Sequence, residues 1–252
     1  MTLEFFLKSL TLIAKRDIIT WFRDVWVNVI LLSYFATGVV LWAATLGQLV
    51  MVKNYFQFLV VGLMVLGIYN TSYHYSEVVA AETRTGYIKY LLTLPLSKGG
   101  LTLGRVVAGA LMGFVYLMLL VLFVAFLVGF PDPLGFLTLL LAVLGMSFCL
   151  SSLGIALATY VRPSLKDPAG DLIGIALIFS STLYYPERLM PAVLIAISRV
   201  NLLSAGVNLM RAGFGLGPVT AGDIVVLSLW CLIFGIASTR GYYRRLQEIS
   251  NR

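Results

Sequence analysis

The chain has 252 residues and a net charge of +7, and 60% of its residues are hydrophobic while only 12% are charged. Soluble domains contain about 45–50% apolar and about 25% charged residues. A water-soluble fold of this size needs more polar surface than this sequence supplies, so the composition excludes an ordinary soluble protein and a disordered one. It indicates a membrane protein with several crossings.

Four long segments contain no Asp, Glu, Lys or Arg, and their lengths indicate membrane-spanning helices. These segments are residues 25–52, 54–76, 106–131 and 133–161. Each holds at least the ~20 residues that one helix needs to cross a bilayer, and none is long enough for two crossings. Two shorter segments, 172–186 and 224–239, reach that length when Asp171 and Arg240 lie at the interface.

The segments predict an all-α polytopic fold with six transmembrane helices. The expected spans are 25–46, 55–75, 104–129, 133–159, 168–185 and 221–240. Asp132 and Asp167 each precede a proline, which is typical of an N-cap followed by proline at the first helical position. Thr220 and Asp223 form a variant of the capping box before the last helix.

The distribution of Lys and Arg predicts the orientation in the membrane. Fourteen of the 18 cations fall in residues 1–24, the connections 76–105 and 160–167, and the tail that begins at Arg240. The other four are Lys53, Arg188, Arg199 and Arg211. The positive-inside rule then places both termini in the cytoplasm. We therefore expect a multi-pass protein of the cell membrane whose positive charge contacts anionic lipid, and no nucleic-acid partner.

Residues 1–24 are expected to form an amphipathic helix that lies on the cytoplasmic membrane surface. Its predicted polar face consists of Glu4, Lys8, Thr11 and Lys15. Its predicted apolar face consists of Leu3, Phe6, Leu7, Leu10, Ile13 and Ala14. A plain cytoplasmic helix is the alternative. The last residues, 241–252, form a basic cytoplasmic tail in this interpretation, and residues 25–240 form the transmembrane domain.

Residue types that carry catalysis or bind cofactors form no recognisable pattern. The single histidine, His74, has no nearby pair of carboxylates, and Cys149 and Cys231 lie in apolar segments. A P-loop motif is missing, and the interior of the first four predicted helices has no ionisable group that could couple transport to an ion. We therefore expect no catalytic, cofactor-binding or metal-binding residue, and any transport would draw its energy from elsewhere.

Residues 77–97 form a long cytoplasmic connection that is helical by composition up to Arg84 and is interrupted at Gly86. A second short helix is predicted to follow, and Pro95 stops it. Three residues form its apolar face: Ile88, Leu91 and Leu92. An apolar face on the cytoplasmic side needs the lipid interface or a partner protein to cover it.

Residues 187–211 contain two apolar runs on either side of Asn201. Each run is about 15 Å long as a helix, which is half of the ~30 Å hydrocarbon core, so neither can span the membrane. We expect a helical hairpin that enters the membrane from the outer face and returns to it.

These motifs, in this order, resemble the permeases of type-2 ABC exporters. The cytoplasmic segment, with Glu82-x-x-x-Gly86 and then Leu91-Leu92-x-x-Pro95, resembles the family's coupling segment. The N-terminal helix, with Arg16, Asp17 and Arg23, resembles its connecting helix. The outer hairpin resembles that of the family at five residues: Pro186, Glu187, Pro191, Asn201 and Arg211.

The resemblance implies a non-catalytic permease that forms a homodimer or heterodimer and binds a separate ATP-hydrolysing subunit, which holds ATP and Mg. The residues that would couple to this subunit are Glu82, Gly86, Ile88, Lys89, Leu91, Leu92 and Pro95. Two alternatives remain, a self-sufficient channel or carrier and a non-transporting membrane scaffold. Drugs, lipids and lipid-linked glycans all remain possible substrates.

Overall fold

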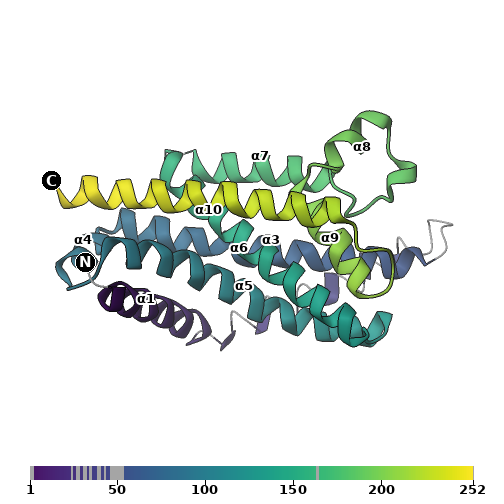
Figure 1. Cartoon of the computed structure of the whole chain (residues 1–252), viewed down its shortest axis with the longest axis horizontal. Coiled ribbons are helices and arrows are strands. Elements are labelled where there is room, and N and C mark those ends of the chain that lie inside the picture. Colours follow the sequence, from purple (N-terminus) through teal and green to yellow (C-terminus); the bar gives the residue numbers. More distant parts are fainter. Residues whose placement is uncertain are drawn as a thin grey trace.

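Every element that the computed structural model describes is a helix (Figure 1). The structure describes residues 3–23, 54–162 and 165–251, together with isolated helical residues between 25 and 45. For residues 68 and 70–77 it describes the backbone only. The predicted span 25–46 therefore lies largely outside the described residues. The elements are α1 (Leu3–Arg23), α3 (Tyr55–Arg84), α4 (Tyr87–Thr93), α5 (Lys98–Val128), α6 (Pro133–Tyr160), α7 (Lys166–Phe179), η1 (Glu187–Leu189), α8 (Ala192–Ser198), α9 (Leu202–Gly213) and α10 (Ala221–Ser250).

Four long helices, α3, α5, α6 and α10, run side by side along the length of the molecule (Figure 1). α1 lies along α5, and α9 packs against α3, α6 and α10. The start of α1, α4 and the end of α10 lie at one end, and α8 and α9 lie at the other (Figure 1). The main apolar core fills the space between α3, α5, α6 and α9, and a second core joins α1, α4, α5 and α10 near the termini.

Three described helices are long and apolar enough to cross a membrane: α5, α6 and α10. The pair α8 and α9, bent by 79° at its break, would add a fourth if it formed one broken span. α7 has only 14 residues and is therefore about 21 Å long. The prediction of an all-helical multi-pass protein is confirmed, whereas the number of six crossings stays a prediction.

The predicted span 168–185 is wrong at its C-terminal end, because α7 ends at Phe179. The hydroxyls of Ser180 and Ser181 donate to the carbonyls of Ala176 and Ile178, at 2.6 and 2.7 Å. Side chains that bond to neighbouring main-chain groups compete with helix continuation. The helix therefore stops six residues before the predicted boundary.

Two of the three predicted helix starts are confirmed. Asp132 Oδ1 accepts a hydrogen bond from Gly135 N at 3.0 Å, and Thr220 Oγ1 accepts one from Asp223 N at 3.1 Å. The third is wrong, since α7 begins at Lys166, two residues before Pro168, with Leu165 at the N-cap position. Asp167 lies instead within the first turn, where its negative charge interacts favourably with the partial positive charge of the helix N-terminus.

α1 buries only part of its predicted apolar face: Ile13 and Ala14 are buried and Phe6 and Leu10 are partly buried. Its polar face is exposed as expected, but Leu3 and Leu7 are exposed too, and the residues that face α5 are Ser9, Ile13, Ala14 and Asp17. The close approach depends on Gly100 and Gly104 of α5. A Cβ at these positions would lie 2.7 Å from Phe6 O and 2.9 Å from Leu10 O. This small-xxx-small spacing is a helix-packing signal that our sequence analysis did not use.

Candidate functional site

Gly86 separates α3 from α4, as the sequence predicts. Its φ of 75° lies in the left-handed region, which glycine adopts without steric cost. α4 then runs for seven residues and stops at Thr93, two residues before Pro95. The break and the short second helix are therefore confirmed. The helix lies at the end of the molecule that holds both termini (Figure 1).

The apolar face of α4 is covered by the chain itself and not by a partner. Ile88 and Leu91 are 1% and 2% exposed, and they belong to the core that contains Ile13 of α1 and Leu246 of α10. Leu92 packs partly buried against the same core. The expectation that these three side chains lack an internal partner is wrong. The pattern i, i+3, i+4 identifies an apolar face, but it does not say what covers that face.

The opposite face of α4 is exposed and aromatic. Tyr87 and Tyr90 are 41% and 55% exposed, and their ring centroids lie 5.6 Å apart. The guanidinium of Arg16 lies 5.7 Å from the centroid of the Tyr87 ring. Lys89 and Pro95 are also exposed. The tyrosines recur three residues apart, a signal that could have identified this face from the sequence.

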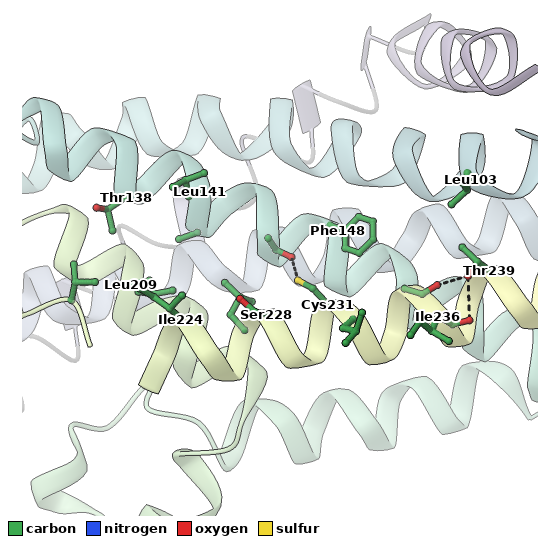
Figure 2. A pocket seen from close by; sticks show the side chains of 16 residues that line it. Leu103, Thr138, Leu141, Phe148, Leu209, Ile224, Ser228, Cys231, Ile236 and Thr239 are labelled. Carbon is green, nitrogen blue, oxygen red and sulfur yellow. Dashed lines mark hydrogen bonds between the residues drawn. The ribbon is translucent and has the colours of Figure 1, made fainter. Parts of the chain in front are cut away.

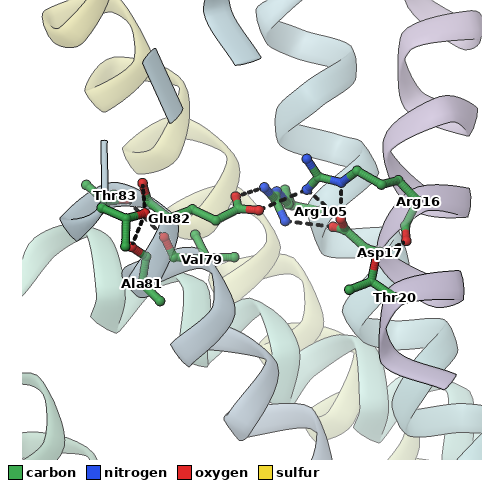
Figure 3. Close-up of polar contacts among 9 residues, drawn as sticks. Arg16, Asp17, Thr20, Val79, Ala81, Glu82, Thr83 and Arg105 are labelled. Carbon is green, nitrogen blue, oxygen red and sulfur yellow. Dashed lines mark hydrogen bonds and ion pairs between the residues drawn. The ribbon is translucent and has the colours of Figure 1, made fainter. Parts of the chain in front are cut away.

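Glu82 lies inside a network of four charged side chains that joins three helices (Figure 3). Arg105 of α5 donates to Asp17 Oδ2 at 2.8 Å and also pairs with the carboxylate of Glu82. Arg16 donates to Asp17 Oδ1 at 2.6 Å and to Glu82 Oε1 at 3.1 Å. The two positive and two negative charges cancel, so the network has no net charge. The expectation that Glu82 flanks a partner's surface is therefore wrong for its carboxylate, which bonds within the chain.

Burial makes this network a strong structural constraint. Arg105 is 0% exposed and Asp17 is 5% exposed, and buried charges are tolerated only when they are paired and hydrogen-bonded. Tyr242 of α10, also buried, contacts Arg105. The network thus ties α1, α3, α5 and α10 together next to α4. The role of Arg105 is not among the sequence-based predictions, although this residue stands at the boundary of a long uncharged segment.

A second point of contact links α4 to α1. Ser97, in the turn between α4 and α5, donates its backbone N–H to Ser9 Oγ at 3.0 Å. Its own hydroxyl oxygen accepts from Gly100 N at 3.0 Å and caps α5. The turn that follows α4 is therefore bonded both to α1 and to the start of α5.

At the other end of the molecule, α8 and α9 form the predicted pair of short helices. Pro186 and Pro191 stand directly before η1 and α8, and Glu187 is exposed in η1. Asn201 caps α9, because its Oδ1 accepts from Leu203 N at 2.7 Å. The prediction of two short helices separated by a bend is confirmed. That this pair enters the membrane from the outer face without crossing it stays a prediction.

Asn201 also holds the end of α7. Its Nδ2 donates to Leu177 O and to Ser180 Oγ, both at 2.8 Å. α9 is buried almost throughout, whereas α8 exposes Val193 and Ile197. The two arms of the pair therefore differ, since α9 is part of the core and α8 lies on the surface.

Arg211 is a buried cation at the end of the molecule that holds α8 and α9. It is 4% exposed, and its guanidinium donates to Thr182 O at 2.9 Å, Leu183 O at 3.0 Å and Phe58 O at 3.1 Å. The guanidinium carbon also lies 3.3 Å from the centroid of the Phe58 ring. Among the described residues no carboxylate pairs with it. Arg211 thus ties α9 to α3 and to the turn that follows α7.

Gly62 makes this arrangement possible. A Cβ on Gly62 would lie 2.3 Å from Leu183 O and 3.0 Å from Arg211 Nη2. Only glycine lets the turn after α7 come this close to α3. Its role cannot be recognised from the sequence, because the contact joins segments that are 121 positions apart.

An apolar groove of about 720 Å³ runs along the surface between α6 and α10 (Figure 2). Leu141, Phe148 and Ile236 are among the residues that line it. Cys231, also a lining residue, donates from its Sγ to Gly145 O at 3.2 Å. The few polar side chains of the groove are Thr138, Ser228 and Thr239. The lining of the groove is therefore almost entirely apolar.

In the part of the chain that the structure describes, no three His, Cys, Asp or Glu side chains lie close enough together to hold a metal ion. Long apolar helices, a buried charge network at one end and a bent helix pair at the other define a multi-pass helical membrane protein. The sequence matches the family described as ABC-2 type transporter over residues 8–214. The chain belongs to this family and is the membrane permease component of a transporter. A search of curated proteins gave no match.

Proposed function

We propose that the chain is the membrane subunit of an ATP-driven exporter and that ATP is hydrolysed on a separate chain. The exposed Tyr87–Tyr90 face of α4 carries this proposal. Aromatic side chains are enriched at protein interfaces, and here they project from a helix whose other face is fixed in the core. The chain has no P-loop of its own, so the nucleotide and Mg would be held by the partner.

The contacts around α4 suggest how such a partner moves the membrane helices. A movement of α4 would be transmitted to α10 through the core that they share. It would be transmitted to α1 through the hydrogen bond of Ser97 and to α3 through the turn at Gly86. The network of Arg16, Asp17, Glu82 and Arg105 holds these helices to one another. The cytoplasmic ends would therefore move as one unit and not as separate helices.

The rest of the proposal concerns assembly and location. Two permease chains, identical or different, would face one another in the cell membrane, with both termini in the cytoplasm. The 14-to-4 distribution of cations supports this orientation. The positive end would lie against anionic lipid.

Substitution Tyr90→Asp is expected to weaken binding of the ATPase subunit while leaving the permease folded. The side chain is 55% exposed, so the change leaves the core intact, but it puts a charge where the partner would desolvate an aromatic ring. A hot-spot aromatic contributes about 2 kcal/mol or more, so binding should fall roughly 30-fold or more. Co-purification with a co-expressed ATP-binding subunit, together with the ATP hydrolysis of the complex, measures the effect.

Two matched variants on the same helix control this experiment. Lys89→Ala, on the exposed side, should have a much smaller effect, because an exposed ion pair contributes only about 0–1 kcal/mol. Leu91→Asp should reduce the amount of folded permease, since Leu91 belongs to the chain's own core. Retention of wild-type binding and hydrolysis by Tyr90→Asp would exclude this docking face and favour the channel or scaffold interpretations.

The orientation is tested by cysteine labelling from the two sides of the membrane. Thr85 is exposed next to α4, and a side chain at Gly217 would meet open space at the other end. In a background without Cys149 and Cys231, Thr85→Cys should react from the cytoplasm and Gly217→Cys from outside. Labelling of both from the same side would contradict the predicted topology.

A further inference from the structure

The two cysteines of the chain meet between α6 and α10, although they lie 82 positions apart in the sequence. The side chains of Cys149 and Cys231 hydrogen-bond to each other. Cys231 Sγ also donates to Gly145 O at 3.2 Å (Figure 2). Gly145 precedes Cys149 by one turn of α6, so both contacts of Cys231 lie on the same face of that helix. The two contacts together place the sulfur of Cys231 beside that of Cys149.

Glycines let α6 and α10 approach each other closely at this place. A Cβ on Gly145 of α6 would lie 3.1 Å from a methyl carbon of Leu227, and a Cβ on Gly235 of α10 would lie 3.2 Å from the ring of Phe148. A disulfide needs its two Cβ atoms within about 4.5 Å of each other, which only helices in close contact provide. The packing on both sides of the two thiols therefore favours an S–S bond here.

The two thiols differ in their access to the bilayer. Cys149 is 0% exposed, whereas Cys231 is partly exposed and lines the apolar groove of about 720 Å³ between α6 and α10 (Figure 2). Sites that hold small molecules commonly have a volume in this range. A molecule dissolved in the membrane can thus reach Cys231, while Cys149 lies behind it in the position to complete a disulfide.

Cys231 lies at the centre of the apolar stretch of α10. This uncharged stretch runs from Ile224 to Thr239, and Cys231 follows its first residue by about 10 Å along the helix. Water-soluble thiols such as glutathione keep cytosolic cysteines reduced, but their charges exclude them from the hydrocarbon core. The oxidation state of this pair is therefore controlled by compounds that dissolve in lipid.

We propose that Cys149 and Cys231 form a disulfide when a lipid-soluble quinone enters the groove. Two S–H bonds break and one S–S bond forms, and the quinone accepts the two electrons and two protons and leaves as a hydroquinone. Ser228 is exposed on the groove three residues before Cys231, so its hydroxyl can donate to a quinone carbonyl. The S–S bond would tie α6 to α10 and restrain movement of one helix past the other. The inference is independent of the ATP-driven function proposed above.

Mass spectrometry of the full-length protein in lipid nanodiscs tests the proposal, with decylubiquinone as the oxidant. The ring of this quinone is fully substituted, so it accepts electrons without forming a stable adduct with a thiol. Wild type should lose the mass of two hydrogen atoms, and its tryptic peptides that contain Cys149 and Cys231 should stay linked until dithiothreitol is added. The linked protein should also unfold at a higher SDS concentration than the reduced protein, because the bond closes a long loop of the chain.

The double variant Ser147→Cys/Cys149→Ala is the matched control, because it moves one thiol around α6 and keeps the number of cysteines. Ser147 is buried like Cys149 and lies about 200° away from it around the helix. This variant should lose the linkage. No linkage in wild type, or equal linkage in the variant, would overturn the proposal. Glutathione disulfide, tested in a parallel reaction, should link the cysteines far less, and equal linkage would overturn the assignment to a lipid-soluble oxidant.

Discussion

Substitution Arg105→Leu is expected to destabilise the protein by about 3–5 kcal/mol, the cost of breaking a buried ion pair by removing one partner. Arg105 is 0% exposed, and its guanidinium pairs with both carboxylates of the network. Without it, Asp17 stays buried and loses one of its ion pairs, and it keeps the pair with Arg16, whose side chain is 29% exposed. The unfolding midpoint in detergent should fall, and α1 should separate from α5.

The control for this prediction comes from the same network. Arg16 has 29% of its side chain exposed, so Arg16→Gln should cost about 1 kcal/mol or less. The double variant Arg105→Leu/Asp17→Asn should recover part of the loss, because it also removes a buried negative charge that Arg105 no longer neutralises. Equal unfolding midpoints for Arg105→Leu and Arg16→Gln would show that the buried ion pairs of Arg105 contribute no more to stability than those of the more exposed Arg16.

The local features of the fold could be predicted from the sequence because they depend on neighbouring residues. The end of α3 at Arg84, the break at Gly86 and the caps at Asp132 and Thr220 all follow from local propensities. The C-terminal end of α7 could not be predicted this way. It depends partly on Asn201, whose amide binds Leu177 O from 24 residues away.

The candidate site shows the same division between local and distant information. The sequence identified Ile88 and Leu91 as one apolar face, but burial by α1 and α10 is a property of the assembled bundle. It also identified Glu82 without its partners, because Arg105 and Arg16 lie 23 and 66 positions away. The residues that remain free for a partner, Tyr87 and Tyr90, become evident only once the covered face is known.

At the opposite end of the molecule, substitution of Arg211 should also destabilise the protein. Arg211→Met keeps much of the side-chain volume and removes the donors to Thr182 O, Leu183 O and Phe58 O. Each buried acceptor that loses its partner costs about 1–3 kcal/mol. Phe58 O lies within α3, so the turn carbonyls should account for most of the loss, about 2–6 kcal/mol in total. SDS-induced unfolding measures it.

Three further variants separate the hydrogen bonds of Arg211 from its charge and its volume. Arg211→Lys keeps the charge but cannot present several N–H groups in one plane, so its stability should lie between wild type and Arg211→Met. Gly62→Ala should destabilise the same contact while the arginine itself is kept, because its Cβ would lie 2.3 Å from Leu183 O and 3.0 Å from Arg211 Nη2. Arg188→Met, at an exposed position of η1, should stay within about 0.5 kcal/mol of wild type. Equal stability of Arg211→Met and Arg188→Met would mean that the turn carbonyls find other donors, and that Arg211 does not hold α9 in place.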